Sequence, residues 1–276
     1  MRVSRIIFTL VDLTLCVSTG PLFGEVRAVP VVNLTNSEDA SAPSAPAATA
    51  DPTQPTPPVG SERFTLWSAV RNIPSDQAAM WTSPFRTGRK DLVWLLPIAA
   101  GTAVFRSTDK KAARKLGNSD RVLGISTDVS RLGSGYADMG AAAVFYAVGK
   151  LTGNERAREI GLLAGESIIN AVLIVDALKL MTNRQRPDHR LHEGRFWGRG
   201  ESFPSGHAGM SWALAAVLAE QYPSPWVRVG VYGWASAVAL SRFTDQKHYP
   251  SDIVVGSAIG YLVGHYVVKH HRRSRP

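Results

Sequence analysis

The sequence has a single cysteine, no long uninterrupted apolar run and no strand-like alternation of apolar and polar residues. Cys16 lies near the start of the chain, so a chain processed after this segment contains no cysteine and forms no disulfide. The apolar runs are mostly shorter than the roughly 20 residues that span a bilayer, and charges such as Asp138, Glu166 and Asp176 interrupt them. These absences favour an exported, peripheral or soluble domain over a multi-pass membrane protein.

The first 28 residues have the order of a secretory signal peptide. Arg2 and Arg5 precede an apolar run from Ile6 to Val17, which Asp12 interrupts. An uncleaved N-terminal anchor is the alternative. Either form predicts a chain of a bacterial-type cell envelope, with its folded domain on the extracytoplasmic side.

Two further segments follow this N-terminal part. Residues 29–60 consist mostly of Pro, Ala, Ser and Thr, with too little bulky apolar surface to offset the entropy of folding. We expect a disordered linker here. Residues 61–276 are long enough for one folded domain with a sizeable core.

The predicted domain is strongly basic. The whole chain has a net charge of +9; three of its 31 basic and five of its 22 acidic residues lie before Ser61, so the domain carries +11. Such an excess favours anionic partners, and no aromatic and basic module typical of nucleic-acid binding is visible. The basic tail from Lys269 to Arg275 is a candidate contact for an anionic membrane surface, or an ordinary solvated end.

The apolar segments of the domain predict an all-α fold, a bundle of about six core helices. Small residues are frequent in these segments and permit close helix packing. Ser205, at a helix start, is a predicted N-cap, and Pro250 stands where a first-turn proline is tolerated. The six expected helices run near Leu92–Phe105, Tyr136–Lys150, Ala157–Met181, His207–Gln221, Val227–Leu240 and Ile253–Lys269.

The first stretch with chemical potential is Lys179-x6-Arg186-Pro187, at the end of the third expected helix. Two cations seven residues apart lie on one face of a helix, where both can reach one dianion. Taken alone, a basic helix end followed by proline is also an ordinary stop signal.

The second stretch is Pro204-Ser205-Gly206-His207, at the start of the fourth expected helix. Free backbone N–H groups at a helix N-terminus favour an anion, Gly206 lets a ligand approach the backbone, and Ser205 can donate a hydrogen bond. A Ser-Gly cap beside a structural histidine is the alternative interpretation.

The third stretch is Ser241-Arg242-x5-His248-x3-Asp252, between the fifth and sixth expected helices. The spacing predicts that the Asp252 carboxylate accepts the Nδ1 proton of His248 and turns Nε2 outward as a nucleophile. If the helices alternate in direction, all three stretches lie at the same end of the bundle.

Together these stretches resemble the three-part signature of the phosphatidic-acid-phosphatase type 2 (PAP2) superfamily, which also includes vanadium haloperoxidases. Every signature position is filled, and the resemblance covers roughly Leu92 to Lys269. It implies a helical phosphatase domain over residues 61–276 that hydrolyses phosphate monoesters or diphosphates, as a lipid phosphate or a small soluble ester, through a phosphohistidine.

The resemblance also implies roles for individual residues. His248 attacks phosphorus, Asp252 orients it, and His207 protonates the leaving oxygen. The phosphoryl oxygens are bound by Lys179, Arg186, Arg242, Ser205 and the Gly206 backbone amide. No cofactor is implied, and no clustered set of His, Cys and carboxylates with metal-ligand spacing is visible in the sequence.

Two alternatives remain open at this stage. The same pocket holding vanadate on His248 describes a vanadate-dependent haloperoxidase, although the short chain leaves little room for additional elements. A non-catalytic envelope protein that binds phosphorylated ligands or lipids would also need the cations. The presence of His207, His248 and Asp252 argues against it, because anion binding alone requires no oriented nucleophile or acid.

Overall fold

The computed structural model describes residues 64–86, 88, 92–116, 120–187 and 194–273. The expected export signal or anchor, Cys16 and the predicted linker lie outside the described residues, as does the predicted start of the domain at Ser61.

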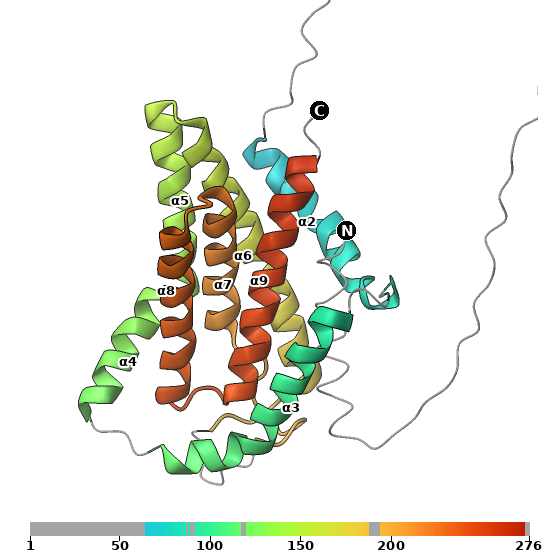
Figure 1. The fold of residues 1–276 in the computed structure, drawn as a ribbon, viewed down its shortest axis with the longest axis vertical. Helices are drawn as coiled ribbons and strands as arrows, with labels where there is room; N and C mark the ends of the chain where they lie inside the picture. The colour runs from blue at the N-terminus through green and yellow to red at the C-terminus, as the bar shows by residue number, and fades with distance from the viewer. Residues whose placement is uncertain (1–63, 87, 89–91, 117–119, 188–193, 274–276) are drawn as a thin grey trace, which may run out of the picture.

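The described residues form α-helices, one short 3-10 helix and connecting loops, and they include no strand (Figure 1). All six expected helices are confirmed, each somewhat longer than its apolar run. The elements are α2 Leu66–Trp81, η1 Pro84–Arg86, α3 Leu92–Lys115, α4 Asp120–Leu132, α5 Gly135–Thr152, α6 Glu155–Thr182, α7 Gly206–Gln221, α8 Pro225–Thr244 and α9 Pro250–Arg273.

The sequence interpretation missed α2 and α4. Pro74, which lies inside α2, normally signals a helix end, and this local signal hid the helix. A capping box defines the start of α2: the Ser68 N–H donates to the Thr65 hydroxyl over 3.2 Å, and the Thr65 N–H donates to the Ser68 hydroxyl over 2.8 Å. The helix α4 is short and mostly polar, so it lacks the apolar run that marked the other helices.

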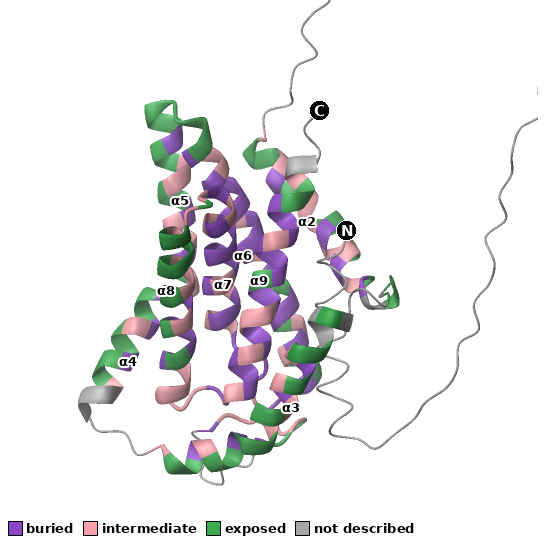
Figure 2. Cartoon of the chain, in the orientation of Figure 1, coloured by how far each residue is buried: buried purple, intermediate pink, exposed green. Residues whose placement is uncertain are grey.

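The hydrophobic core lies where α6, α7 and α9 pack together, and the outer helices are exposed on one side (Figure 2). Ile168, Leu178, Val217 and Ile259 are among its fully buried side chains. The long apolar helices therefore cover one another, which accounts for the lack of a strongly one-sided polar pattern along them.

Glycine allows α7 and α9 to approach at backbone contact. A Cβ atom at Gly260 would lie 2.0 Å from the Gly209 carbonyl oxygen, and one at Gly264 would lie 2.6 Å from that of Ala213. A Cβ atom at Gly256 would lie 2.3 Å from the Ser205 carbonyl oxygen, so this glycine brings the start of α7 against the start of α9.

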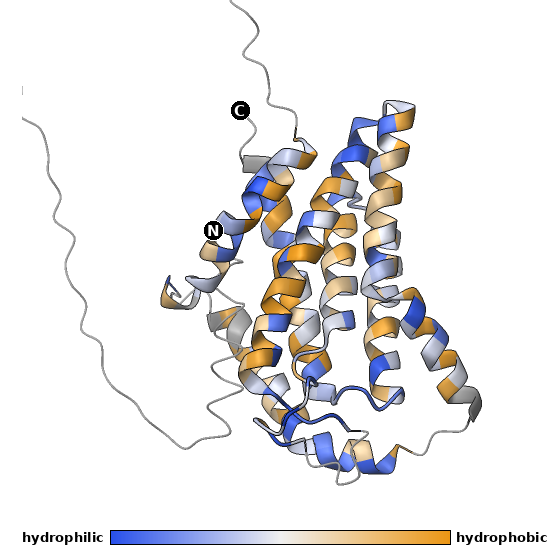
Figure 3. Ribbon diagram, turned by 180° about the vertical axis from the view of Figure 1, so that it is seen from behind, coloured by the Kyte–Doolittle hydropathy of each residue, from blue (hydrophilic) through white to orange (hydrophobic). Residues whose placement is uncertain are grey.

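The helix ends that carry the three stretches meet at one end of the bundle. The C-terminal ends of α6 and α8 and the N-terminal ends of α7 and α9 lie together at the bottom of Figure 1. Seen from behind, the loops at this end are hydrophilic while the helices above them are largely apolar (Figure 3). The described part of the loop before α7, from Gly194 to Phe203, crosses this end without forming a helix, as the sequence predicts.

Among the helices that the structure describes, two are long and apolar enough to cross a membrane, namely α6 and α9. Most of each helix is nevertheless buried inside the bundle: 67% of the most apolar stretch of α6 and 72% of that of α9. Their apolarity is therefore explained by the core. Large exposed apolar side chains are frequent on the outer helices, among them Tyr136, Val144, Val148 and Leu151 on α5, and Trp226, Val229, Trp234 and Leu240 on α8.

Candidate active site

Two cations of the first stretch are placed by the end of α6. Lys179 is in the last turn, and Asn183 ends the helix in the left-handed conformation. A Cβ atom at Gly206 would lie 3.4 Å from the Lys179 ammonium nitrogen, so this cation lies beside the start of α7. Lys179 also pairs with Asp176 over 3.1 Å, and an Arg186 guanidinium nitrogen lies 3.9 Å from a Glu201 carboxylate oxygen.

The start of α7 has the features of an anion site. Ser205 is the N-cap, as predicted, but its buried hydroxyl makes no side-chain capping bond and has no hydrogen-bond partner in the described part of the chain. The Ser205 backbone N–H donates to the Asp252 carbonyl oxygen over 3.0 Å, which fixes the α7 start to the α9 start. An unpaired hydroxyl beside free helix N–H groups is suited to an incoming phosphate oxygen.

The turn after α8 joins Arg242 to His248. The backbone N–H groups of Lys247 and His248 both donate to the Arg242 carbonyl oxygen, over 3.1 and 3.2 Å. The Arg242 guanidinium contacts the Ser130 hydroxyl of α4 and lies 3.3 Å from an Asp245 carboxylate oxygen. The five-residue spacing of the third stretch therefore returns the chain to the helix end that carries Arg242.

The predicted hydrogen bond from His248 to Asp252 is wrong. The His248 Nδ1 atom lies 2.6 Å from the Ser202 backbone carbonyl oxygen and 3.9 Å from the closest Asp252 carboxylate oxygen. A carbonyl oxygen only accepts hydrogen bonds, so Nδ1 carries the hydrogen and Nε2 keeps its lone pair. The tautomer is the expected one, but a different group sets it.

Asp252 acts on His248 through an intermediate residue. Its carboxylate accepts the Ser202 hydroxyl over 2.5 Å and the Tyr249 backbone N–H over 2.8 Å. Because the carbonyl of Ser202 holds the imidazole, Asp252 positions His248 by fixing Ser202. The sequence spacing could not indicate this, since Ser202 lies far from His248 along the chain.

A buried ion-pair network behind His248 was not predicted. The fully buried Arg184 donates to Asp109 of α3 over 2.6 Å, to the Ser251 hydroxyl over 2.8 Å, and to Asp252. The Arg184 backbone carbonyl accepts the Ser202 N–H over 2.9 Å. Arg184 therefore holds both Ser202 and Asp252. The sequence interpretation missed it because its partners lie on α3, on α9 and in the loop before α7, far from it along the chain.

The three predicted cations act on the pKa values of both histidines. Burial, together with the positive charges of Arg242, Lys179 and Arg186, lowers the pKa of His207 to about 4. Burial also lowers the pKa of His248 well below its ordinary value, with Arg242, Arg186 and Lys179 acting in the same direction. Both rings are therefore neutral near pH 7 without a bound anion.

A solvent-facing pocket of about 520 Å³ opens beside this centre. His207, Arg242 and Asp245 line it on one side, and α4 lines the other with Thr127 and Ser130. The helix α4, which the sequence interpretation missed, thus forms a wall of the candidate active site.

All eight predicted site residues belong to one end of the bundle, where three cations lie near two imidazoles with lowered pKa values. The fold and this end of the bundle therefore define an all-α protein with a cationic, histidine-containing candidate site. Residues 160–276 match the sequence profile of the PAP2 superfamily. All eight predicted site residues lie inside this matched stretch.

Two known phosphatases are similar to part of this chain. The chain is 36% identical over 93 residues to a lipid A 1-phosphatase of Porphyromonas gingivalis, covering 33% of this chain and 19% of that protein. It is 38% identical over 112 residues to a decaprenylphosphoryl-5-phosphoribose phosphatase of Mycobacterium tuberculosis, covering 40% of this chain and 60% of that protein. The chain thus spans less than two thirds of either relative.

A solved structure has the same fold. The transmembrane PAP2-type phosphatidylglycerolphosphate phosphatase of Bacillus subtilis superposes with a TM-score of 0.50 at 20% sequence identity. The match covers 75% of this chain and 96% of that chain. The all-α bundle predicted from the sequence is therefore confirmed as a PAP2-type fold.

Proposed function

We propose that the protein is a metal-independent phosphatase that hydrolyses a phosphate monoester or diphosphate through a phosphohistidine on His248. The observation that carries the proposal is the meeting of three cations, an unpaired Ser205 hydroxyl and two neutral imidazoles at the start of α7. Pure anion binding would need the cations but not a histidine oriented through Ser202.

In the first step, Lys179, Arg186 and Arg242 bind the phosphoryl oxygens, and the Ser205 hydroxyl and Gly206 N–H donate to them. The Nε2 lone pair of His248 attacks phosphorus as the bond to the leaving oxygen breaks. Fixed cations take up the charge that spreads over the equatorial oxygens. His207, protonated in the substrate complex, gives its proton to the leaving oxygen.

In the second step, water attacks the phosphohistidine. Neutral His207 takes a proton from the water, the N–P bond breaks, and inorganic phosphate leaves with the free imidazole of His248 restored. The proton gained by His207 readies it for the next turnover. Asp252 and Arg184 stay in place as positioning residues throughout.

The proposed substrate is a phosphorylated lipid of the cell envelope, with the active site on the extracytoplasmic side. Both relatives named above act, by their names, on phosphorylated lipids. Exposed apolar side chains on α5 and α8 support membrane association. A small soluble ester presents the same phosphate to the pocket, so the experiment must separate the two classes.

A substrate panel tests this proposal. Full-length protein, fractionated into membrane and soluble pools, is assayed with phosphatidic acid, a polyprenyl diphosphate, a lipid A phosphate and an aryl phosphate. We expect phosphate release in the membrane pool, with kcat/KM highest for a lipid. Turnover confined to soluble esters would exclude the lipid assignment, and bromide oxidation by the vanadate-loaded protein would identify a haloperoxidase instead.

Replacing His207 by alanine should affect poor leaving groups most. Without a general acid, an alkoxide leaves unprotonated, whereas a nitrophenolate needs little help. We expect kcat to fall about 100- to 10,000-fold for an alkyl phosphate and far less for 4-nitrophenyl phosphate. A leaving-group series measured on parent and variant checks this, and an equal loss across the series would contradict the acid role.

The pH dependence of kcat/KM should respond to the cations around His207. Because positive charge lowers the pKa of His207, removing the charge with Lys179→Gln should raise it. The alkaline limb of kcat/KM should then move upward by about 0.5 to 1 pH unit. Lys247→Gln is the matched control, since Lys247 lines the same pocket but is not among the charges that shift His207.

Both proteins are assayed with one substrate, so that its own ionisation affects them equally. A limb that stays at the parental pH in Lys179→Gln, or that moves equally in Lys247→Gln, would show that Lys179 does not act on the titrating group.

A further inference from the structure

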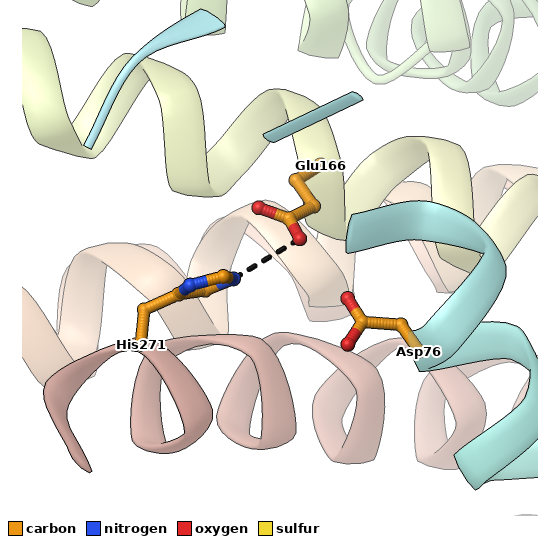
Figure 4. Close-up of side chains that lie close together, drawn as sticks. All are labelled: Asp76, Glu166 and His271. Atoms are coloured by element: carbon orange, nitrogen blue, oxygen red, sulfur yellow. Dashed lines mark hydrogen bonds and ion pairs between the residues drawn. The ribbon is translucent and has the colours of Figure 1, made fainter. Parts of the chain in front are cut away.

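A second cluster of titratable side chains lies away from the phosphate site. Asp76 of α2, Glu166 of α6 and His271 of α9 turn their functional groups toward one another (Figure 4). Lys179 is about 20 Å further along α6 than Glu166, at a rise of about 1.5 Å per residue. His271 is in the last turn of α9, whereas Asp252 is in its first turn.

The cluster has the dimensions of a metal site. One ligand atom from each residue lies within 4.8 Å of the other two. The His271 Nε2 atom is 3.0 Å from a Glu166 carboxylate oxygen. Two ligands on one tetrahedral Zn²⁺ lie about 3.3 Å apart at bond lengths of about 2.0 to 2.2 Å, so His271 and Glu166 are already close to this geometry. The Asp76 carboxylate would have to move by about 1 to 1.5 Å.

Two oxygens of the cluster have no hydrogen-bond partner in the described part of the chain. These are Asp76 Oδ1 and Glu166 Oε2, and the residues that carry them are 0% and 2% exposed. The other Asp76 oxygen accepts the Asn170 side-chain amide over 3.3 Å. Buried carboxylate oxygens without donors are costly unless they are protonated or bound to a cation.

The two carboxyl groups of the cluster also have raised pKa values. Burial raises the pKa of Glu166 to about 8. Burial, followed by the proximity of Glu166, raises the pKa of Asp76 to about 7. A divalent cation would displace these protons and neutralise both carboxylates, which is the usual coupling between metal binding and ionisation.

We propose that Asp76, Glu166 and His271 bind one divalent transition-metal cation of the Zn²⁺ type, which fastens α2 to α6 and α9. An imidazole with two carboxylates is a donor set suited to Zn²⁺. The spacing analysis indicated no metal cluster because the three ligands come from helices far apart in the sequence. The role of this site is structural. Its test does not depend on the phosphatase proposal.

Zinc titration of the full-length, chelator-treated protein tests the site. We expect uptake of one Zn²⁺ per chain by calorimetry and a rise in Tm at saturating Zn²⁺. Asp76→Asn and Glu166→Gln should each weaken binding at least tenfold and lose the Tm rise. Zn²⁺ taken up elsewhere is common to all these proteins and cancels in the comparison.

Glu220→Gln is the matched control. Glu220 and His265 form a carboxylate–imidazole pair over 2.8 Å that resembles Glu166 and His271, but no second carboxylate joins them in the described residues. This variant should bind Zn²⁺ like the parent. Where Glu166→Gln does not fold, His271→Asn at the end of α9 provides the same comparison.

Equal Zn²⁺ affinity in the parent and the cluster variants, or a Tm that Zn²⁺ leaves unchanged, would overturn the proposal. Chelation should lower Tm without changing initial rates of phosphate release well below Tm. A loss of rate at that temperature would instead count against metal-independent hydrolysis. The proposed metal site is decided by the Zn²⁺ affinities of the parent and the cluster variants.

Discussion

Replacing His248 by alanine is expected to abolish phosphatase turnover, lowering kcat by at least about 10,000-fold. The N–P bond cannot form without Nε2, and the cations that remain can bind a phosphate ester but not cleave it. Initial rates with an aryl phosphate check the loss. A phosphoenzyme that is acid-labile and alkali-stable should be trapped in the parent and absent from the variant.

Vanadate inhibition of the parent checks the phosphate pocket, and a second histidine of α9 provides the control for turnover. A trigonal vanadate resembles the phosphoryl transition state, so it should inhibit the parent by occupying the site. His265→Ala, on the same helix α9 but paired with Glu220, serves as the control and should keep parental turnover. Substantial activity in His248→Ala, or an intact labelled phosphoenzyme, would remove His248 from the proposed mechanism.

Arg184→Met should cost about 3 to 5 kcal/mol of folding stability, because it leaves two buried carboxylates without their cation. Asp109 and Asp252 are both fully buried, and both depend on this guanidinium. Turnover should fall as well, since Arg184 also holds Ser202 in place to orient His248. Urea unfolding and kcat, measured on the same preparation, check the two effects.

Arg131→Met is the control for stability. Arg131 pairs with Asp128 over 3.6 Å, but both side chains are about three quarters exposed, so the pair should contribute less than about 1 kcal/mol. Arg184→Lys should fall between parent and Arg184→Met, because one ammonium cannot reach both carboxylates with the fork of a guanidinium. An Arg184→Met protein as stable as Arg131→Met would show that the network does not stabilise the fold.

The missed elements show where local patterns fail. The helix α2 contains a proline and α4 is mostly polar, yet both form because they pack on helices that the sequence places elsewhere in the chain. The same limit affected His248. Its partner was expected four residues away at Asp252, but a loop carbonyl at Ser202 takes the hydrogen bond because the loop before α7 folds over the start of α9.

The sequence by itself determined the six apolar helices, the Ser205 cap and the grouping of the three motif stretches at one end. The spacing of apolar residues, the capping chemistry and the alternation of helix direction act over a few residues or along one helix. The tertiary structure alone decided the Arg184 network, the hydrogen bond that orients His248 and the meeting of Asp76, Glu166 and His271. Each of these joins side chains from separate helices or loops, and their contacts depend on how those elements pack rather than on any spacing along the chain.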